Sequence, residues 1–115
     1  MNDFPVLDKE TALSRLANNH SLYNKVLVMF TEQAGEMLTM LEALPQDQIA
    51  NQHLALHSLK GSAGEVGATR LFYTLQQIDQ TLKTAPEHVT ADQIEDVIAE
   101  IRRILNITAP GNPAA

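Results

Sequence analysis

Apolar residues along this chain recur three and four positions apart, between short clusters of helix-breaking residues. This spacing gives each segment one apolar face when the backbone coils as an α-helix. No stretch shows the strict alternation of a half-buried strand. The breaks fall at residues 5, 18–20, 45–47, 67–69, 85–89 and 110–113. The sequence therefore predicts an all-α chain divided into a few helices.

The predicted helices cover residues 8–18, 21–44, 47–66, 70–84 and 91–106. Asp8, Ser21 and Thr69 stand where a side-chain oxygen would cap the first turn of a helix, and Asp47 begins the third helix. The segment Thr90–Gln93 reads as a capping box, in which two residues satisfy each other's backbone amides. The ends of the helices are thus predicted from local chemistry.

The four longer helices are amphipathic and follow one another through short connections, which predicts an antiparallel four-helix bundle. The short first helix would close one end of it. We expect an N-terminal arm over residues 1–7, the bundle over 8–106 and a flexible tail over 107–115. Met29, Met37 and Met40, at helical spacing, are interpreted as filler of the core rather than as a cofactor site.

Composition excludes several classes of protein. The chain has 115 residues, 14 acidic and 8 basic, so its net charge of −6 does not suit nucleic-acid phosphates. It has no cysteine, which excludes disulfides, thiolate metal sites and cysteine nucleophiles. No apolar run approaches the ~20 residues that cross a bilayer, and the first residues do not resemble a signal peptide. We expect a monomeric cytoplasmic domain with neither a nucleic-acid nor a membrane partner.

The third helix carries the candidate chemistry. On a helical wheel its apolar residues face the core, whereas His57 lies toward solvent. Lys60, Gly61 and Gly64 follow His57 at three, four and seven positions and share its sector. Each glycine destabilises a helix by about 1 kcal/mol relative to alanine, but leaves the approach to the imidazole unobstructed. An exposed neutral imidazole near an ammonium suits a group that receives an anion from a large partner.

The wheel alone also allows a plainer interpretation. A single histidine on a helix surface is usually a solvated side chain, and surface lysines are common. Gly64 and Gly67 could simply fray and end the helix, with Gly67 as its C-cap. The geometry by itself leaves both interpretations open.

The string HSLKGSAGEVGA at residues 57–68 resembles the signature of histidine phosphotransfer domains, which reads H-x-L-K-G-S-x-x-x-x-G-A. The resemblance continues outside this motif, over most of residues 6–105. It includes Leu7-Asp8, Leu13, Leu16, Leu22-Tyr23, Phe30, Leu71 and Ile78-Asp79. The chain departs from the family where Ile78-Asp79 replaces the usual Leu-Glu, where Leu75 replaces a smaller residue and where Glu65 is charged. These departures bear on docking preferences rather than on the chemistry.

The resemblance implies a function. His57 would accept a phosphoryl group from the aspartyl phosphate of a receiver domain and pass it to the aspartate of another receiver, as in two-component signalling. Lys60 would offset negative charge on the transferring oxygens, and Gly61 and Gly64 would admit the partner's loops. The chain would bind no cofactor of its own, because the receiver supplies Mg²⁺. It has no glycine-rich nucleotide loop, so phosphorylation by ATP is not expected and the chain would be a carrier rather than a kinase.

Further candidate residues lie around this site. His53 and His57, four positions apart, are spaced as two ligands of one metal, but no third ligand is evident and no metal is expected. His53, Ala68 and Phe72 are candidate docking residues beside Gly61 and Gly64. Two alternatives to a phosphoryl carrier stay open: an unphosphorylated adaptor that binds a protein through the same face, and a small metal-binding bundle.

Overall fold

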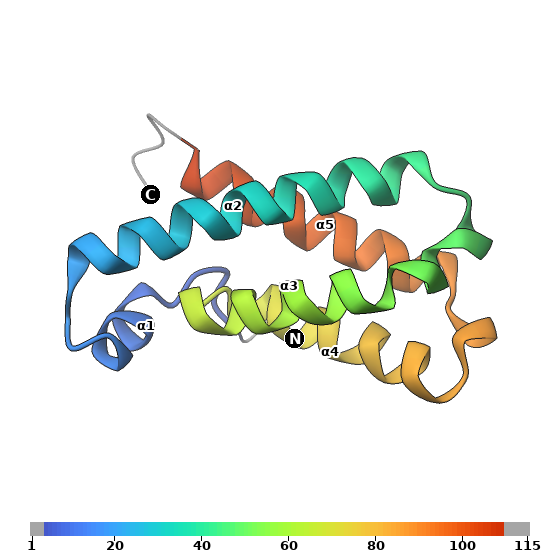
Figure 1. The fold of residues 1–115 in the computed structure, drawn as a ribbon, viewed down its shortest axis with the longest axis horizontal. Coiled ribbons are helices and arrows are strands. Elements are labelled where there is room, and N and C mark those ends of the chain that lie inside the picture. The colour runs from blue at the N-terminus through green and yellow to red at the C-terminus, as the bar shows by residue number, and fades with distance from the viewer. Residues whose placement is uncertain (1–3, 110–115) are drawn as a thin grey trace.

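The structure is a computed structural model that describes residues 4–109. Its four long helices are α2 (His20–Ala43), α3 (His53–Val66), α4 (Thr69–Thr84) and α5 (Ala91–Thr108). Successive helices run in opposite directions, with α2 and α4 each packed against both α3 and α5 (Figure 1). The short helix α1 (Lys9–Arg15) closes the end of the bundle where α2 begins (Figure 1). None of the described residues is in a strand, which confirms the predicted all-α bundle.

Several predicted helix boundaries are wrong by a few residues. The predicted third helix is divided into a 3₁₀ helix, η1 (Gln46–Gln52), and α3. At the start of η1 the amide of Gln48 donates to the carbonyl of Pro45, three residues back, which is the 3₁₀ pattern. A second 3₁₀ helix, η2 (Pro86–His88), precedes α5. The last helix continues to Thr108, two residues into the predicted tail, while residues 110–115 and 1–3 lie outside the described residues.

The caps follow local chemistry, although not always at the predicted residue. The side chain of Asp8 accepts from the amide of Thr11, and Thr90 and Gln93 form the predicted capping box. At the start of α2, Asn19 rather than Ser21 is the N-cap, because its side chain accepts from the amide of Leu22. Thr69 is the first residue of α4 and not its cap. The N-cap of α2 is thus a polar residue two positions before the predicted one.

The core lies along the bundle axis and is built from the predicted apolar faces. Its largest fully buried side chains are Tyr23, Phe30, Ile49, Leu56, Leu59, Leu71, Leu75, Ile78, Ile101 and Ile104. Met37 is buried as predicted, but Met29 is 69% exposed, so its interpretation as core filler is wrong. Leu22, one helical turn before the partly buried Val26, is 42% exposed.

The turn between α3 and α4 is fixed from two sides. Gly67 has a φ of 84°, the left-handed conformation that ends a helix, which confirms it as the C-cap. Its carbonyl accepts from the amide of Asp8 at 2.6 Å, and a Cβ at Gly67 would collide with the Asp8 carbonyl. The described part of the N-terminal arm therefore packs on this turn, with the Pro5 carbonyl accepting from the amide of Arg70. Such close backbone approach needs glycine.

Tyr23 ties α2 to the end of α3. Its hydroxyl donates to the carbonyl of Val66 at 2.7 Å, which satisfies one of the backbone acceptors left open at a helix end. Burial, assisted by the charge of Asp8, raises the pKa of Tyr23 to about 12, so the hydroxyl stays a donor. In the part of the chain that the structure describes, no helix is both long and apolar enough to cross a membrane.

Candidate functional site

His57 projects from the outer face of α3. Leu56 and Leu59 on the same helix are fully buried, and this fixes the rotation of α3 in the bundle. The side chain of His57 consequently remains 56% exposed, on the side that the helical wheel indicates. Its ring leans toward α4, where it meets a carboxylate.

That carboxylate belongs to Asp79 of α4 and is the centre of the site. Nδ1 of His57 lies 3.2 Å from Oδ2 of Asp79 and 3.3 Å from Oδ1. Nε2 of His53 lies 2.9 Å from Oδ1, and Nζ of Lys60 lies 2.9 Å from Oδ2. The side chain of Asp79 is only 4% exposed. One buried acid thus joins three side chains of α3, which we call the Asp79 cluster: His53, His57, Lys60 and Asp79.

The charge of Asp79 is set by its neighbours. Burial alone would raise the pKa of this carboxyl, but hydrogen bonds from Lys60, His57 and His53, together with the Lys60 charge, lower it to about 2. The carboxylate is therefore ionised at neutral pH and can only accept hydrogen bonds. It follows that Nδ1 of His57 carries the proton.

This assignment determines which nitrogen of His57 is available for reaction. A neutral imidazole protonated on Nδ1 has its lone pair on Nε2. No hydrogen bond within residues 4–109 engages Nε2 of His57. The unprotonated nitrogen thus faces solvent, and Asp79 opposes rotation of the ring.

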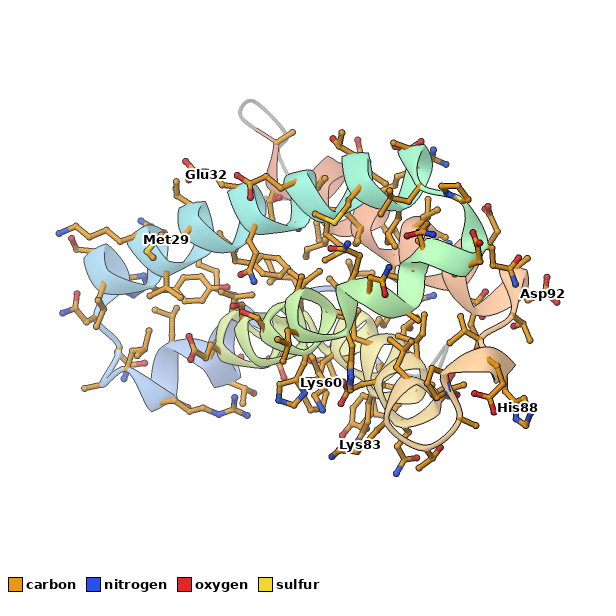
Figure 2. The ribbon with its side chains drawn as sticks, turned by 45° about the vertical axis from the view of Figure 1, so that its right-hand side comes forward. Met29, Glu32, Lys60, Lys83, His88 and Asp92 are labelled. Atoms are coloured by element: carbon orange, nitrogen blue, oxygen red, sulfur yellow. The ribbon has the colours of Figure 1, made fainter. Side chains whose placement is uncertain are left out.

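Lys60 is held more firmly than its position on the wheel suggests. Its ammonium is paired with Asp79, and its side chain is 20% exposed. Figure 2 labels Lys60 on α3. Because it lies one helical turn from His57, the ammonium adds positive charge beside the ring. His53, one turn before His57, donates from Nε2 to Asp79, since an ionised carboxylate accepts only. Both side chains therefore brace the carboxylate.

The two glycines differ in their surroundings. A Cβ added at Gly61 would meet no atom within 4 Å, so the backbone there is open to a partner. A Cβ at Gly64 would lie 3.4 Å from the ring of Phe72, an ordinary contact. The Gly64 carbonyl also accepts from Arg15 of α1 at 3.2 Å. Gly61 is consequently the more accessible of the two.

Two of the predicted docking residues are less accessible than expected. Ala68 has 0% exposure and is part of the hydrophobic core, so its side chain cannot contact a partner. Phe72 is partly buried and stands edge-on to Tyr73 at a ring separation of 5.2 Å. Tyr73 in turn stacks on Phe4.

The described residues give no support to a metal site. No group of three or more histidine, aspartate or glutamate side chains within residues 4–109 is placed to hold a metal ion. In the Asp79 cluster the Lys60 ammonium already occupies the carboxylate, and its charge would repel a cation.

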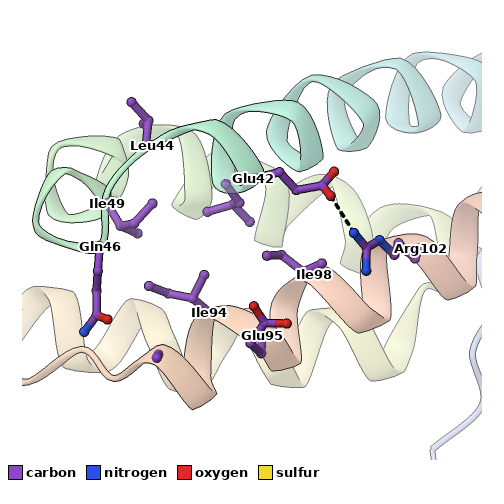
Figure 3. Close-up of a pocket in the computed structure, with 10 residues that line it drawn as sticks. Glu42, Leu44, Gln46, Ile49, Ile94, Glu95, Ile98 and Arg102 are labelled. Atoms are coloured by element: carbon purple, nitrogen blue, oxygen red, sulfur yellow. Dashed lines mark hydrogen bonds and ion pairs between the residues drawn. The ribbon is translucent and has the colours of Figure 1, made fainter.

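A pocket of about 350 Å³ lies elsewhere, between the end of α2, η1 and α5. The ion pair between Glu42 and Arg102 spans it, and Ile49, Ile94 and Ile98 line it (Figure 3). None of the predicted site residues borders this pocket.

Asp79 is the residue that the sequence analysis did not assign to the site. As a departure from the family pattern, Asp79 is expected to bear on docking alone, and its contact with Nδ1 of His57 shows that this expectation is wrong. A signal was nevertheless present: Asp79 follows Leu71 by eight positions and Leu75 by four, which places a carboxylate on the apolar stripe of its helix. Because acids are almost never fully buried unless paired, such a position predicts a partner of opposite charge.

The fold and the site together define a class: a helical bundle that presents one braced, exposed imidazole to another molecule. Comparison with family models assigns the family. The model of the Hpt domain matches residues 25–107, which is most of the chain and includes the whole Asp79 cluster. The chain therefore belongs to the Hpt domain family, whose members carry out histidine phosphotransfer in phosphorelays and interact with receiver domains. Neither the curated proteins nor the solved structures gave a match.

Proposed function

We propose that His57 is the phosphoryl acceptor, taking the group from the aspartyl phosphate of one receiver domain and delivering it to the aspartate of another. The observation that carries this proposal is the exposed Nε2 of His57, whose ring is held through Nδ1 by Asp79. It is supported by membership of the Hpt family.

The transfer exchanges a P–O bond for an N–P bond. Nε2 of His57 attacks phosphorus, so an N–P bond forms while the P–O bond to the receiver's aspartate breaks and that carboxylate leaves. The ring keeps its proton on Nδ1 and becomes cationic, and the Asp79 carboxylate stabilises this charge at 3.2 Å. The same steps in reverse pass the group to a second receiver.

Other groups assist without forming bonds to phosphorus. Lys60 places its ammonium where it offsets charge on the phosphoryl oxygens. The open backbone at Gly61 allows the receiver's loops to approach the ring. The receiver supplies Mg²⁺, so the chain contributes a nucleophile and its positioning rather than a complete catalytic site.

The test is phosphotransfer from a receiver domain labelled with radioactive acetyl phosphate in the presence of Mg²⁺. Wild type, His57→Gln and the matched control His53→Gln are compared. We expect acid-labile, base-stable label on wild type and on His53→Gln, and none on His57→Gln. All three proteins should remain folded at the assay temperature, which circular dichroism checks, because both histidines lie outside the hydrophobic core.

Two outcomes would contradict the proposal. Label on His57→Gln would place the acceptor elsewhere. The absence of label on wild type, with a broad panel of phosphorylated receivers, would favour an adaptor that binds without phosphorylation.

A further inference from the structure

Exposed apolar surface on this bundle is concentrated on two neighbouring helices. Among the described residues, the large apolar side chains that are exposed lie on α2 and α3, not on α4 or α5. They are Leu22, Val28, Met29 and Leu54, with exposed fractions of 42%, 56%, 69% and 85%. Leu54 lies one helical turn before His57, whereas Met29 lies beside Ser62 and Glu65, at the other end of α3.

A groove between α2 and α3 adjoins this surface. It has a volume of about 400 Å³, and Val26, Met29 and Phe30 provide its apolar lining. Gln33, which also lines it, donates to the hydroxyl of Ser58 at 3.1 Å. Ser58 directly follows His57, about 100° further around α3, so the groove lies on the α2 side of α3 while the imidazole faces α4.

Three carboxylates surround the groove: Glu32 and Glu36 on α2 and Glu65 on α3. We call them the acidic rim; Figure 2 shows Glu32 beside Met29 on α2. None of the three has an ion-pair partner within residues 4–109, although Glu42, Asp79 and Glu100 all do. Glu32 and Glu36 are also four positions apart on one helix face, where like charges repel by a few tenths of a kcal/mol. A basic partner would relieve this repulsion.

The opposite flank of His57 offers less to a partner. On α4, Phe72 packs at Gly64, and the next residue, Tyr73, is covered by Phe4 at a ring separation of 4.3 Å. The chain's own N-terminal segment therefore occupies part of that flank. A stable interface covers roughly 800 Å² on each partner, enough to include the α2–α3 groove together with His57.

We propose that the acidic rim selects, among receiver domains, those that carry lysine or arginine beside an apolar patch next to their aspartate. The apolar patch would pack on Met29 and Leu54, and the basic side chains would pair with Glu32, Glu36 and Glu65. This inference rests on the proposed function, because it takes the partner of His57 to be a receiver. A second copy of this chain is a poorer occupant, since two acidic rims would face each other.

The test compares two variants that remove the same amount of charge. The rim variant is Glu32→Gln/Glu36→Gln/Glu65→Gln. Its control is Glu87→Gln/Glu95→Gln/Asp96→Asn, which neutralises three exposed acids on η2 and α5. The probe is a phosphorylated receiver with lysine or arginine beside its aspartate, and kcat/KM for transfer is measured at low and high salt.

We expect the rim variant to lose about tenfold in kcat/KM at low salt, because rim charges act mainly on the association rate. We also expect its salt dependence to flatten, whereas the control variant keeps that of wild type. Leu54→Ser and Met29→Ser should each weaken receiver binding several-fold in titration calorimetry. For a receiver that carries acidic residues at the same places, kcat/KM should be higher with the rim variant than with wild type.

Phosphoramidate, a small phosphoryl donor that needs no docking, separates this inference from the proposed function. Equal labelling of wild type and both variants by phosphoramidate, with loss of receiver transfer only in the rim variant, supports the docking surface. If receiver transfer is the same for the rim and control variants, the proposed docking surface is wrong, whereas His57 remains the proposed phosphoryl acceptor. If neither donor labels wild type, both proposals fall. A dimer in sedimentation that Met29→Ser abolishes would assign the surface to a second copy and overturn the inference.

Discussion

Oδ2 of Asp79 lies 2.9 Å from Nζ of Lys60, and the same carboxylate accepts from Nδ1 of His57. The ammonium of Lys60 is thus balanced by Asp79 before any phosphoryl group arrives. In the proposed transfer, a phosphoryl group on Nε2 would give the ammonium a second anion within one helical turn, while Asp79 would stabilise the cationic ring. The structure therefore holds the Lys60 ammonium one helical turn from the proposed acceptor.

Asp79→Asn should allow His57 to adopt both neutral tautomers. An amide can accept or donate, so it no longer requires the proton to be on Nδ1. We expect nitrogen chemical shifts of His57 to change from one tautomer to a mixture, and phosphotransfer to slow. Asp96→Asn, an exposed acid on α5, is the control and should change neither. An unchanged tautomer in Asp79→Asn would show that the carboxylate does not position the ring.

Stability in acid should report the same carboxylate. The pKa of Asp79 falls from its ordinary value of 3.8 to about 2 in the folded protein, so ionised Asp79 contributes roughly 2 kcal/mol to the free energy of unfolding. Because the folded pKa is the lower one, this contribution is complete above the unfolded pKa and is lost as the pH falls through the folded pKa. Urea unfolding between about pH 4 and pH 2 should show this loss in wild type and not in Asp79→Asn. Parallel pH profiles would refute it.

Lys60→Ala should slow transfer while the protein still folds. A hydrogen bond to a charged group contributes roughly 1.5–3 kcal/mol, so the single-turnover rate should fall about tenfold to a hundredfold. Lys83→Ala removes an exposed lysine of α4 and should leave the rate unchanged. Lys60→Arg should restore part of the rate, since it keeps the charge. A normal rate in Lys60→Ala would remove the lysine from the mechanism.

Gly61→Ala should separate stability from transfer. A Cβ there meets nothing within 4 Å, so alanine should stabilise the exposed helix by up to about 1 kcal/mol. Gly35→Ala is the matched control, because a Cβ on Gly35 of α2 is equally unobstructed. Gly35 lies two turns from Glu42, which pairs with Arg102 of α5, so it faces away from α3. Both variants should melt higher, and only Gly61→Ala should transfer more slowly; equal rates would show that the bare backbone is not needed.

Features that depend on residues within one helical turn could be predicted from the sequence, and features that depend on distant residues could not. The position of His57 on the outer face of α3 and the capping box at Thr90 were predicted correctly, because helical period and capping depend on residues within a turn of each other. The prediction that Met29 lies in the core is wrong, because spacing shows only that a residue lies near an apolar stripe. It does not show whether a neighbouring helix covers that residue. Ala68 is buried in a core most of whose other members are distant in sequence, which spacing alone does not reveal.

By itself, the sequence determined that this chain forms amphipathic helices, that four of them pack as a bundle, and that a histidine with a lysine one turn away faces outward. Only the tertiary structure decided that Asp79 reaches that histidine from 22 residues away, and that Tyr23 closes the end of α3 from 43 residues away. The physical reason is the range of the interactions. Helices arise from contacts within a turn, whereas a buried carboxylate meets its partners only once two helices have packed at a fixed rotation and height.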